Sequence, residues 1–378
     1  MKKGMILPMT LVMILAMLLG SAQAQARESE ILRITAQDGY PLEGKLDMPE
    51  GEVSRVVVFV NGSGPNTYDN KRALGEGTFN YFDLFSQQLT QKGVAFFRAG
   101  TRGCTPGEEP PLYTHVDEMA YQTYVPENSI RDVEEVVKAL KADARLKDAQ
   151  VYLLGWSEGT MIAAHVAARA NVPIDHLMLC GYANGRMMDM LTWQQTGGSA
   201  MVTYGQYFDA DGDGRLSRAE YAADPYQVAK ALGGEAFEQL DVDSDGVITS
   251  ADFGRMQASG WAELKGAIER KDDAWLKENY PVRLTSAWFE GHAALAPCSE
   301  VLPELTLPID IFHGRRDANC DVQGVYDIEK QFSALGKRNL TTHVYPEADH
   351  DLNYITYVLT GKVPEPLAEL FAAMTGQG

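Results

Sequence analysis

The chain has 378 residues, and its 52 acidic and 33 basic side chains give a net charge of −19. Such an acidic protein repels nucleic acid and anionic membrane surfaces, so neither is expected as a partner, whereas cation binding is favoured. The length allows one large α/β domain that carries an insertion.

The N-terminal segment, residues 1–24, has the pattern of a secretory signal peptide. Lys2 and Lys3 precede an apolar run from Met5 to Leu19, and Ala22-Gln23-Ala24 forms a cleavage site of small residues. The apolar run is shorter than the ~20 residues that a membrane-spanning helix needs. We therefore expect export, to the periplasm or out of the cell, without stable membrane insertion.

Apolar strands then alternate with helices in two parts of the chain, residues 25–181 and 305–378. The first part is expected to contain a hairpin at 31–36 and 40–48, strands at 55–60, 94–98, 150–154 and 176–180, and helices at 82–91, 129–140 and 160–170. The second part is expected to contain strands at 309–313 and 341–345, and helices at 322–335 and 364–374. Ser129 and Asp132 form a capping box at the start of the helix at 129–140. This alternation predicts an α/β fold with a mostly parallel sheet and helices on both faces.

A G-x-S-x-G pentapeptide at residues 155–159 joins the strand at 150–154 to the following helix. In this context it predicts a nucleophile elbow, a strained turn that exposes the Ser157 hydroxyl for attack on a carbonyl carbon. Gly155 and Gly159 allow the neighbouring backbone to approach closely. Because glycine and serine are common, the pentapeptide alone is a weak signal, and an ordinary strand-to-helix turn is the alternative.

The alternation of strands and helices stops between residues 182 and 304, where the chain is acidic and expected to be helical. We interpret this segment as an insertion over the carboxyl ends of the strands, where open α/β sheets bind their ligands. Its aromatic residues, such as Trp288, are expected to pack between helices, and the alternative is that they line an acyl or leaving-group pocket.

Two loops in the insertion, residues 209–220 and 241–252, have the pattern of EF-hand calcium sites. Ca²⁺ takes about six to eight oxygen ligands, and a glycine in each loop permits the sharp bend. The expected ligands are Asp209, Asp211, Asp213, Glu220 and the Arg215 carbonyl in the first loop, and Asp241, Asp243, Asp245, Asp252 and the Val247 carbonyl in the second.

The second loop ends in Asp252 where the first ends in Glu220, and the shorter side chain predicts a weaker site or one more tolerant of Mg²⁺. Leu216 and Ile248, the apolar residues of the two loops, are expected to lie side by side. Because exported EF-hands bind Ca²⁺ weakly, we expect the ion to order the insertion as a lid over Ser157 and not to act in signalling. A pair of solvated acidic turns is the alternative.

A serine nucleophile needs a histidine base and an acid that orients the base. In sheets of this kind the acid and then the histidine follow the serine along the chain. Asp317 follows the strand at 309–313, and His350 follows the strand at 341–345. Ser157, Asp317 and His350 are therefore the predicted triad, with Asp321 as the competing acid.

An oxyanion hole needs two backbone N–H groups that point at the developing negative charge. One is expected from Glu158, the residue after the nucleophile. The second is expected from Ser63 or Gly62, in the glycine-containing loop that follows the strand at 55–60. A flexible glycine turn is the alternative for that loop.

In combination, Asn61-Gly62-Ser63-Gly64-Pro65, Arg102-Gly103, the pentapeptide at 155–159, Gly314-Arg315-Arg316-Asp317 and Ala348-Asp349-His350 resemble the α/β-hydrolase superfamily. Within it, the chain resembles serine esterases close to the dienelactone hydrolase and prolyl-oligopeptidase-type branch, over residues 30–181 and 305–375. Three features depart from the family pattern. Asn61 stands where histidine is commoner, Thr160 replaces a second glycine after the elbow, and the acid loop from Asp317 to Val322 is longer than usual.

Four cysteines, Cys104, Cys180, Cys298 and Cys320, follow the signal segment. An oxidising compartment permits disulfides, and four cysteines allow three full pairings. We expect Cys180, at the end of an apolar strand, to be buried, and we favour a bridge between Cys298 and Cys320. None of the four has the spacing of a metal site.

These features predict an exported serine hydrolase that acts on a small carboxylic ester and binds Ca²⁺ in its insertion, with no cofactor for catalysis. A prolyl-oligopeptidase-type peptidase is the first alternative, although no propeller-like region precedes the hydrolase segment. A calcium-responsive binding protein on an inactive hydrolase frame is the second, against which the intact order of the triad argues. The sequence leaves open the ester, its acyl length, the choice between ester and amide, and the oligomeric state.

Overall fold

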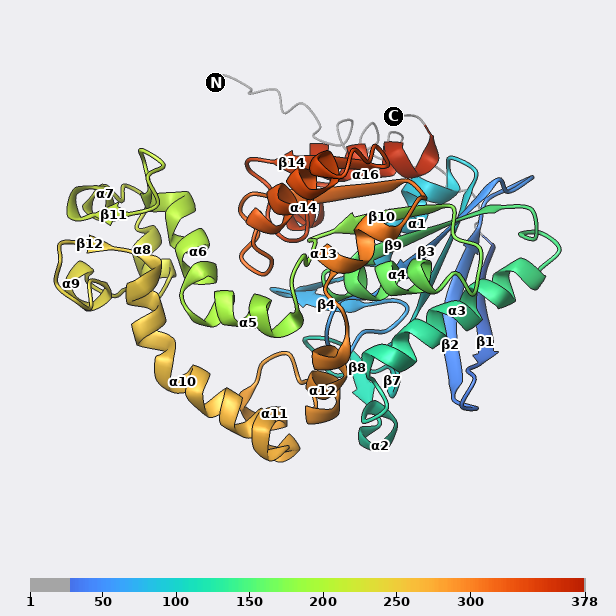
Figure 1. The fold of residues 1–378 in the computed structure, drawn as a ribbon, viewed down its shortest axis with the longest axis horizontal. Helices are drawn as coiled ribbons and strands as arrows, with labels where there is room; N and C mark the ends of the chain where they lie inside the picture. The colour runs from blue at the N-terminus through green and yellow to red at the C-terminus, as the bar shows by residue number, and fades with distance from the viewer. Residues whose placement is uncertain (1–27, 377–378) are drawn as a thin grey trace, which may run out of the picture.

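An eight-stranded sheet forms the centre of the computed structural model, which describes residues 28–376 (Figure 1). The strand order is β1-β2-β6-β3-β9-β10-β13-β14. β1 pairs with β2, and β2 with β6, in antiparallel fashion, and all later neighbours are parallel. The strands are β1 (Glu28–Thr35), β2 (Pro41–Met48), β3 (Arg55–Val60), β6 (Val94–Ala99), β9 (Gln150–Trp156), β10 (His176–Cys180), β13 (Ile309–Gly314) and β14 (Leu340–Tyr345).

Helices cover both faces of this sheet, so the predicted fold class is confirmed. Side chains alternate between the faces along each strand. In β3, Val56, Val58 and Val60 therefore belong to one buried core, and Val57 and Phe59 to the other. The first core is covered by α3 (Pro126–Ala142), α4 (Glu158–Arg169) and α14 (Gln323–Ala334), and the second by α1 (Phe82–Thr90), α15 (Tyr354–Thr360) and α16 (Glu365–Thr375).

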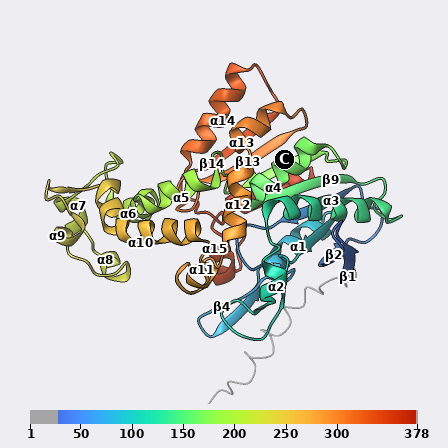
Figure 2. The ribbon, with the colours of Figure 1, turned by 60° about the horizontal axis from the view of Figure 1, so that its bottom comes forward.

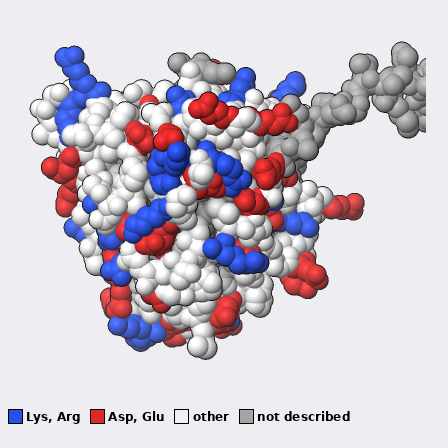
Figure 3. Space-filling model, turned by 90° about the vertical axis from the view of Figure 1, so that its right-hand side faces the viewer, with Lys and Arg blue, Asp and Glu red and all other residues white. Residues whose placement is uncertain are grey.

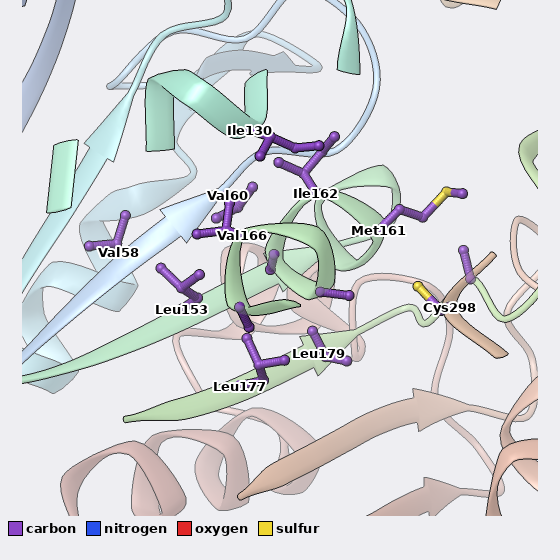
Figure 4. Close-up of a cluster of buried hydrophobic side chains, with 14 of the residues drawn as sticks. Val58, Val60, Ile130, Leu153, Met161, Ile162, Val166, Leu177, Leu179 and Cys298 are labelled. Carbon is purple, nitrogen blue, oxygen red and sulfur yellow. The ribbon is translucent and has the colours of Figure 1, made fainter. Parts of the chain in front are cut away.

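The first core packs α4 directly onto the central strands (Figure 4). Val58, Leu153 and Leu177 come from three neighbouring strands, and Ile162 and Val166 face them from α4. These side chains are almost fully buried. Their burial fixes α4, and with it the turn that connects β9 to α4.

Most predicted elements are confirmed, including the hairpin and the strand at 55–60, but α3 begins earlier than expected. Its first residue is Pro126, whose fixed φ and missing N–H suit a helix start. The predicted capping box of Ser129 and Asp132 is therefore wrong, because both residues lie inside the helix. Asp132 instead accepts hydrogen bonds of 2.6 Å from the Arg102 guanidinium.

Two short hairpins and a helix between β3 and α3 were not expected from the sequence. They are β4 (Lys71–Leu74) with β5 (Gly77–Asn80), and β7 (Cys104–Pro106) with β8 (Thr114–Val116), followed by α2 (Glu118–Tyr121). Their strands are too short and too polar to show a period of two in the sequence.

The segment from residue 182 to residue 304 is mainly helical, as expected. It contains α5 (Met187–Gln195), α6 (Gly198–Phe208), α7 (Arg218–Ala222), α8 (Val228–Ala231), α9 (Phe237–Leu240), α10 (Ser250–Arg270), α11 (Asp273–Asn279), α12 (Ser286–Ala294), α13 (Cys298–Val301), the 3-10 helix η1 (Leu302–Glu304) and the short strands β11 (Leu216–Ser217) and β12 (Val247–Ile248).

The part of this segment between α6 and α10 extends away from the sheet (Figure 1, Figure 2). It has a small core of its own, formed by residues such as Tyr204, Phe208 and Phe253. The two acidic loops belong to this projecting lobe, while α5 and α12 lie next to the sheet.

All four cysteines are free and buried in the structure, so the favoured Cys298–Cys320 bridge is wrong. The Cys298 thiol contacts the Thr160 carbonyl at 3.9 Å, and the Cys320 sulfur lies 3.3 Å from the sulfur of Met190. Each thiol is thus used in packing. Cys180 is fully buried, as predicted.

Acidic and basic side chains are intermixed on the face of the molecule shown in Figure 3. Within residues 28–376 no helix is long and apolar enough to cross a membrane. The predicted signal peptide, residues 1–24, lies outside the described residues.

Candidate active site

Ser157 occupies a strained turn between β9 and α4. Its φ of 56° and ψ of −121° are costly for a residue with a side chain. A Cβ on Gly155 would lie 2.4 Å from the Gly159 carbonyl oxygen, and a Cβ on Gly159 would lie 2.1 Å from the Val60 carbonyl oxygen. Both flanking positions therefore need glycine, as the motif predicts. The Ser157 N–H donates to the Cys180 carbonyl at 2.9 Å, which ties the turn to β10.

Asp317 and His350 lie together at the carboxyl ends of β13 and β14. His350 Nδ1 donates to Asp317 Oδ2 at 2.8 Å, and Asp317 Oδ1 accepts the N–H groups of Asn319 and Cys320, each at 2.8 Å. The Asp317 side chain is fully buried. Gly181 leaves room for the imidazole, since a Cβ there would lie 2.6 Å from His350 Cε1. The competing acid, Asp321, instead accepts the Gln323 N–H at the start of α14.

His350 and Asp317 each stabilise the charged form of the other. Burial alone would lower the pKa of His350, but the Asp317 charge and hydrogen bond raise it to about 9. Burial would raise the pKa of Asp317, and the His350 charge and hydrogen bond hold it below its ordinary value. His350 Nδ1 is engaged by Asp317, so in the neutral imidazole, whose share grows as the pH approaches about 9, Nε2 is the nitrogen that can accept a proton from a nucleophile.

His313, buried in β13, holds the acid loop. Its Nδ1 accepts the Tyr182 N–H at 3.0 Å, so its proton must sit on Nε2, which lies 3.1 Å from the Cys320 carbonyl. Burial lowers the pKa of His313, in keeping with this neutral tautomer. From the sequence, His313 is interpreted as a packing residue or as a residue that supports the site. In the structure it supports the loop that follows Asp317.

Three backbone N–H groups near Ser157 are available to bind a negative oxygen. In residues 28–376 the N–H groups of Gly62, Ser63 and Glu158 have no hydrogen-bond partner. Gly62 lies against the serine, since a Cβ there would be 3.2 Å from Ser157 Cβ. Asn66 Nδ2 donates to the carbonyls of Gly62 and Gly64 at 3.1 Å and so fixes this loop. Of the predicted donors, Gly62 thus lies against the serine, and Glu158 follows it directly in the chain.

The Glu158 side chain joins the elbow to the insertion, which the sequence did not reveal. It is 1% exposed, and its Oε1 accepts from Trp288 Nε1 at 2.9 Å and from His292 Nε2 at 2.8 Å. Tyr124 donates its hydroxyl to Oε2. Trp288 and His292 both belong to α12. In the sequence only a glutamate directly after Ser157 is visible, and its burial and its partners depend on tertiary packing.

A pocket of about 450 Å³ opens over Ser157 and His350. The sheet side supplies aromatic side chains such as Phe59, Tyr81 and Trp156, and the insertion supplies apolar side chains from α5 and from residues 280–288. Residues 195–279, which include both acidic loops, contribute nothing to its lining. The parts of the insertion that line the pocket are therefore its two ends, and the acidic loops do not take part.

Carboxylate oxygens converge in each acidic loop. In the first loop, oxygens of Asp209, Asp211 and Glu220 lie within 4.8 Å of one another. In the second loop the corresponding group is Asp241, Asp243 and Asp245. As predicted, Leu216 and Ile248 are paired, in the antiparallel strands β11 and β12. Both groups offer the hard oxygen ligands that Ca²⁺ prefers.

The two loops differ at their last position. Asp252 is buried, accepts the N–H and hydroxyl of Thr249 at 2.9 Å, and pairs with Arg255 at 3.2 Å. The same guanidinium contacts Asp243 at 2.7 Å. Glu220 instead accepts from Ser217 and from the Ala210 N–H, with no basic side chain within 4.0 Å in the described residues. A cation in the second loop would compete with Arg255 for two carboxylates.

The pairing of His350 with Asp317 predicts a pH dependence of stability. A pKa raised to about 9 in the folded state, against about 6.5 when unfolded, stabilises the fold fully below about pH 6.5, and this stabilisation is lost as the pH rises through about 9. Asp317→Asn should therefore destabilise more at about pH 6 than at about pH 10. Urea unfolding in both buffers measures this, with Asp321→Asn as the control. An equal loss at both pH values would contradict the pairing.

Residues 57–355 match the family described as the alpha/beta hydrolase fold. The proline iminopeptidase of Mycobacterium smegmatis is similar in structure, with a TM-score of 0.51 and 16% identity over 92% of this chain and 97% of that chain. For the acylaminoacyl peptidase of Pyrococcus horikoshii the TM-score is 0.50 and the identity 13%, over 97% of this chain and 42% of that chain. An esterase from Exiguobacterium antarcticum has a TM-score of 0.46 and 15% identity, over 91% of this chain and 98% of that chain.

At such low identities these structures share the fold alone, and no curated protein matches the chain. The family match supports a hydrolase without specifying its type. Because that match spans most of its length, the chain belongs to the alpha/beta hydrolase fold family.

Proposed function

We propose that the protein is an exported serine hydrolase that cleaves carboxylic esters, with Ser157 as nucleophile, His350 as base and Asp317 as the acid that orients it. One observation carries the proposal: Ser157, in a strained elbow, shares a pocket with an imidazole whose other nitrogen is held by a buried carboxylate. Export rests on the signal-peptide pattern of residues 1–24.

The mechanism follows from the hydrogen bonds. Ser157 Oγ attacks the ester carbonyl carbon while His350 Nε2 takes the hydroxyl proton. The carbonyl oxygen becomes negative and is bound by the N–H of Glu158 and that of Gly62 or Ser63. His350 returns the proton to the leaving alcohol, and an acyl group remains on Ser157. Water then attacks the acyl carbon while His350 Nε2 takes one of its protons. The bond to Ser157 Oγ breaks, His350 returns the proton to Oγ, and the acid is released.

We further propose that the insertion binds Ca²⁺ with the ligands predicted above, more tightly in the first loop than in the second. The converging oxygens of Asp209, Asp211 and Glu220 support the first site. The ion pairs of Arg255 with Asp243 and Asp252 support the weaker second site. Bound Ca²⁺ would neutralise the like charges and hold the lobe between α6 and α10 in order.

The nucleophile is tested with p-nitrophenyl esters of graded acyl length. Wild type should hydrolyse at least one of them, and Ser157→Ala should lower kcat by about 10⁴- to 10⁶-fold. A fluorophosphonate should label wild type and not the variant. If p-nitroanilides are hydrolysed and none of the esters is, the result would point to a peptidase. If no substrate is hydrolysed and the fluorophosphonate does not label the protein, the result would point to a binding protein.

Glu158→Gln tests whether the insertion holds the oxyanion donor. The substitution weakens the bonds to Trp288 and His292, and we expect kcat to fall about tenfold with KM nearly unchanged, because misaligned oxyanion donors affect the transition state. Glu127→Gln, which breaks surface ion pairs with Arg131 and Arg169, is the matched control. An increase in KM alone would contradict this role.

Calcium binding is tested by titration calorimetry and thermal unfolding. Ca²⁺ should bind with a dissociation constant of about 10⁻⁴ to 10⁻³ M, the range of extracellular sites, and a chelator should lower the melting temperature. Glu220→Gln should weaken the tighter site, while Glu269→Gln, an exposed residue of α10, should not. An unchanged melting temperature in chelator, together with no heat of binding, would refute the proposal.

A further inference from the structure

One end of the pocket over Ser157 is polar. Asn66, Asn70 and Arg72 line it there, whereas much of the remaining lining is aromatic or aliphatic. Arg72 belongs to β4, and Asn70 immediately precedes that strand. Asn70 has a positive φ of 47°, and both its side chain and that of Arg72 line the same pocket.

Arg72 makes no close ion pair in the described residues, although the more distant Asp351 charge partly compensates its own. In residues 28–376 no carboxylate lies within 4.0 Å of its guanidinium, although acidic residues outnumber basic ones by 52 to 33 in the chain. It donates to the Lys71 carbonyl at 3.1 Å, and only at 3.4 Å to the Leu112 carbonyl and Asn66 Oδ1. Burial lowers the pKa of Arg72, so its charge is not fully compensated by the protein.

Asn70 provides an independent observation. Its side chain is 8% exposed, makes no hydrogen bond in the described residues, and its buried Oδ1 has no partner. Its backbone is nevertheless held, because the N–H donates to Thr67 Oγ1 at 3.0 Å and the carbonyl accepts the Tyr81 N–H at 3.2 Å. Asn70 Nδ2 donates to no acceptor in the described residues, so it is free to donate to a ligand oxygen, whereas Oδ1 is an acceptor that only a ligand donor would satisfy.

This polar end lies beside the reaction centre. Asn66 accepts from Arg72 through Oδ1 and donates through Nδ2 to the carbonyls of Gly62 and Gly64. The loop of Gly62 and Gly64, which supplies the proposed oxyanion donors, is thus in direct contact with Asn66, and Asn66 is hydrogen-bonded to Arg72. A group bound by Arg72 would belong to the same substrate molecule that Ser157 attacks.

We propose that Arg72 and Asn70 bind a carboxylate of the substrate, so that the preferred ester carries a negative charge on its acyl part. This inference rests on the proposed ester hydrolysis and names its substrate class. The planar guanidinium can bond both oxygens of a carboxylate, and the Asn70 amide can donate a further hydrogen bond. The charge-assisted bonds would orient the acyl chain along the pocket toward Ser157.

Two carboxylates, Asp349 and Asp351, also line the pocket and would favour a cationic substrate instead. Asp349 Oδ1 already accepts the N–H groups of Asp351 at 3.0 Å and Asn353 at 2.7 Å, where it fixes the turn after His350. Asp351 Oδ1 lies 3.5 Å from the Tyr81 hydroxyl. Burial raises the pKa of Asp351 and so disfavours its charged form. The Arg72 guanidinium is bonded to neutral oxygens alone, and for this reason we assign the charge preference to Arg72.

The test compares three p-nitrophenyl esters of similar length: the monoester of adipate, which ends in a carboxylate, the neutral hexanoate, and the ε-aminohexanoate, which ends in an amine. Wild type should show the highest kcat/KM with the adipate ester. Arg72→Gln should reduce the ratio of adipate to hexanoate kcat/KM by about tenfold to hundredfold, the value of a charge-assisted hydrogen bond, and Asn70→Ala should reduce it less. A preference of wild type for the amine ester would overturn the proposal.

Lys71→Gln is the matched control. It removes a positive charge next to Arg72, but Lys71 lies over the Tyr113 ring and does not line the pocket. The ratio should be unchanged in this variant. An equal loss in Lys71→Gln and Arg72→Gln would mean that only the general charge of β4 matters, and the assignment to Arg72 would be wrong.

A binding measurement separates this inference from the proposed reaction. Calorimetry on Ser157→Ala should show that the monoamide of adipate, which ends in a carboxylate, binds more tightly than neutral hexanamide, and that Arg72→Gln in the same background removes the difference. That result would support the anion site even if no ester were hydrolysed. Equal binding of both ligands, with hydrolysis of neutral esters by wild type, would refute the anion site and leave the esterase proposal standing.

Discussion

The carboxylate of Glu158 connects the parts of the molecule that must act together. A buried charge is tolerated only where it is fully hydrogen-bonded, and here the donors, Tyr124 and the α12 residues Trp288 and His292, are all far from Glu158 in sequence. Removal of any donor would leave the charge under-compensated. The insertion is therefore tied to the residue that follows Ser157, so the pocket wall and the proposed oxyanion donor are positioned by one interaction.

The strain at Ser157 is supported by packing on both sides of the turn. Before the turn, β9 lies in the middle of the sheet between β3 and β10. After it, α4 buries Ile162 and Val166 against those strands. A positive φ at a serine costs about 1–3 kcal/mol, which this packing offsets. Because β13 and β14 run parallel to β9, the loops with Asp317 and His350 leave the sheet at the same edge as the elbow.

The sequence was sufficient for the features that depend on local pattern. Buried strands such as β3 read as continuous apolar runs, and the elbow, acid loop and histidine loop each follow such a strand, so the fold class and the grouping of Asp317 with His350 could be predicted. The start of α3 was misplaced because a plausible capping box competed with Pro126. The Cys298–Cys320 bridge was misjudged because cysteine spacing does not show how each thiol is packed.

Features that depend on residues distant in sequence could not be predicted. Nothing near Glu158 indicates that Trp288 and His292 are its partners, and β4 is too short to reveal that Arg72 and Asn70 face the pocket.

The same limit applies to the part of the insertion that lines the pocket. The acidic loops have the clearest sequence motif in the insertion, yet they lie in the projecting lobe. The pocket is instead lined by α5 and residues 280–288. Any effect of a cation on the reaction must therefore pass through α6 and α10, which pack together and against α5. Such an effect would act on the shape of the pocket, because the loops contribute no side chain to it.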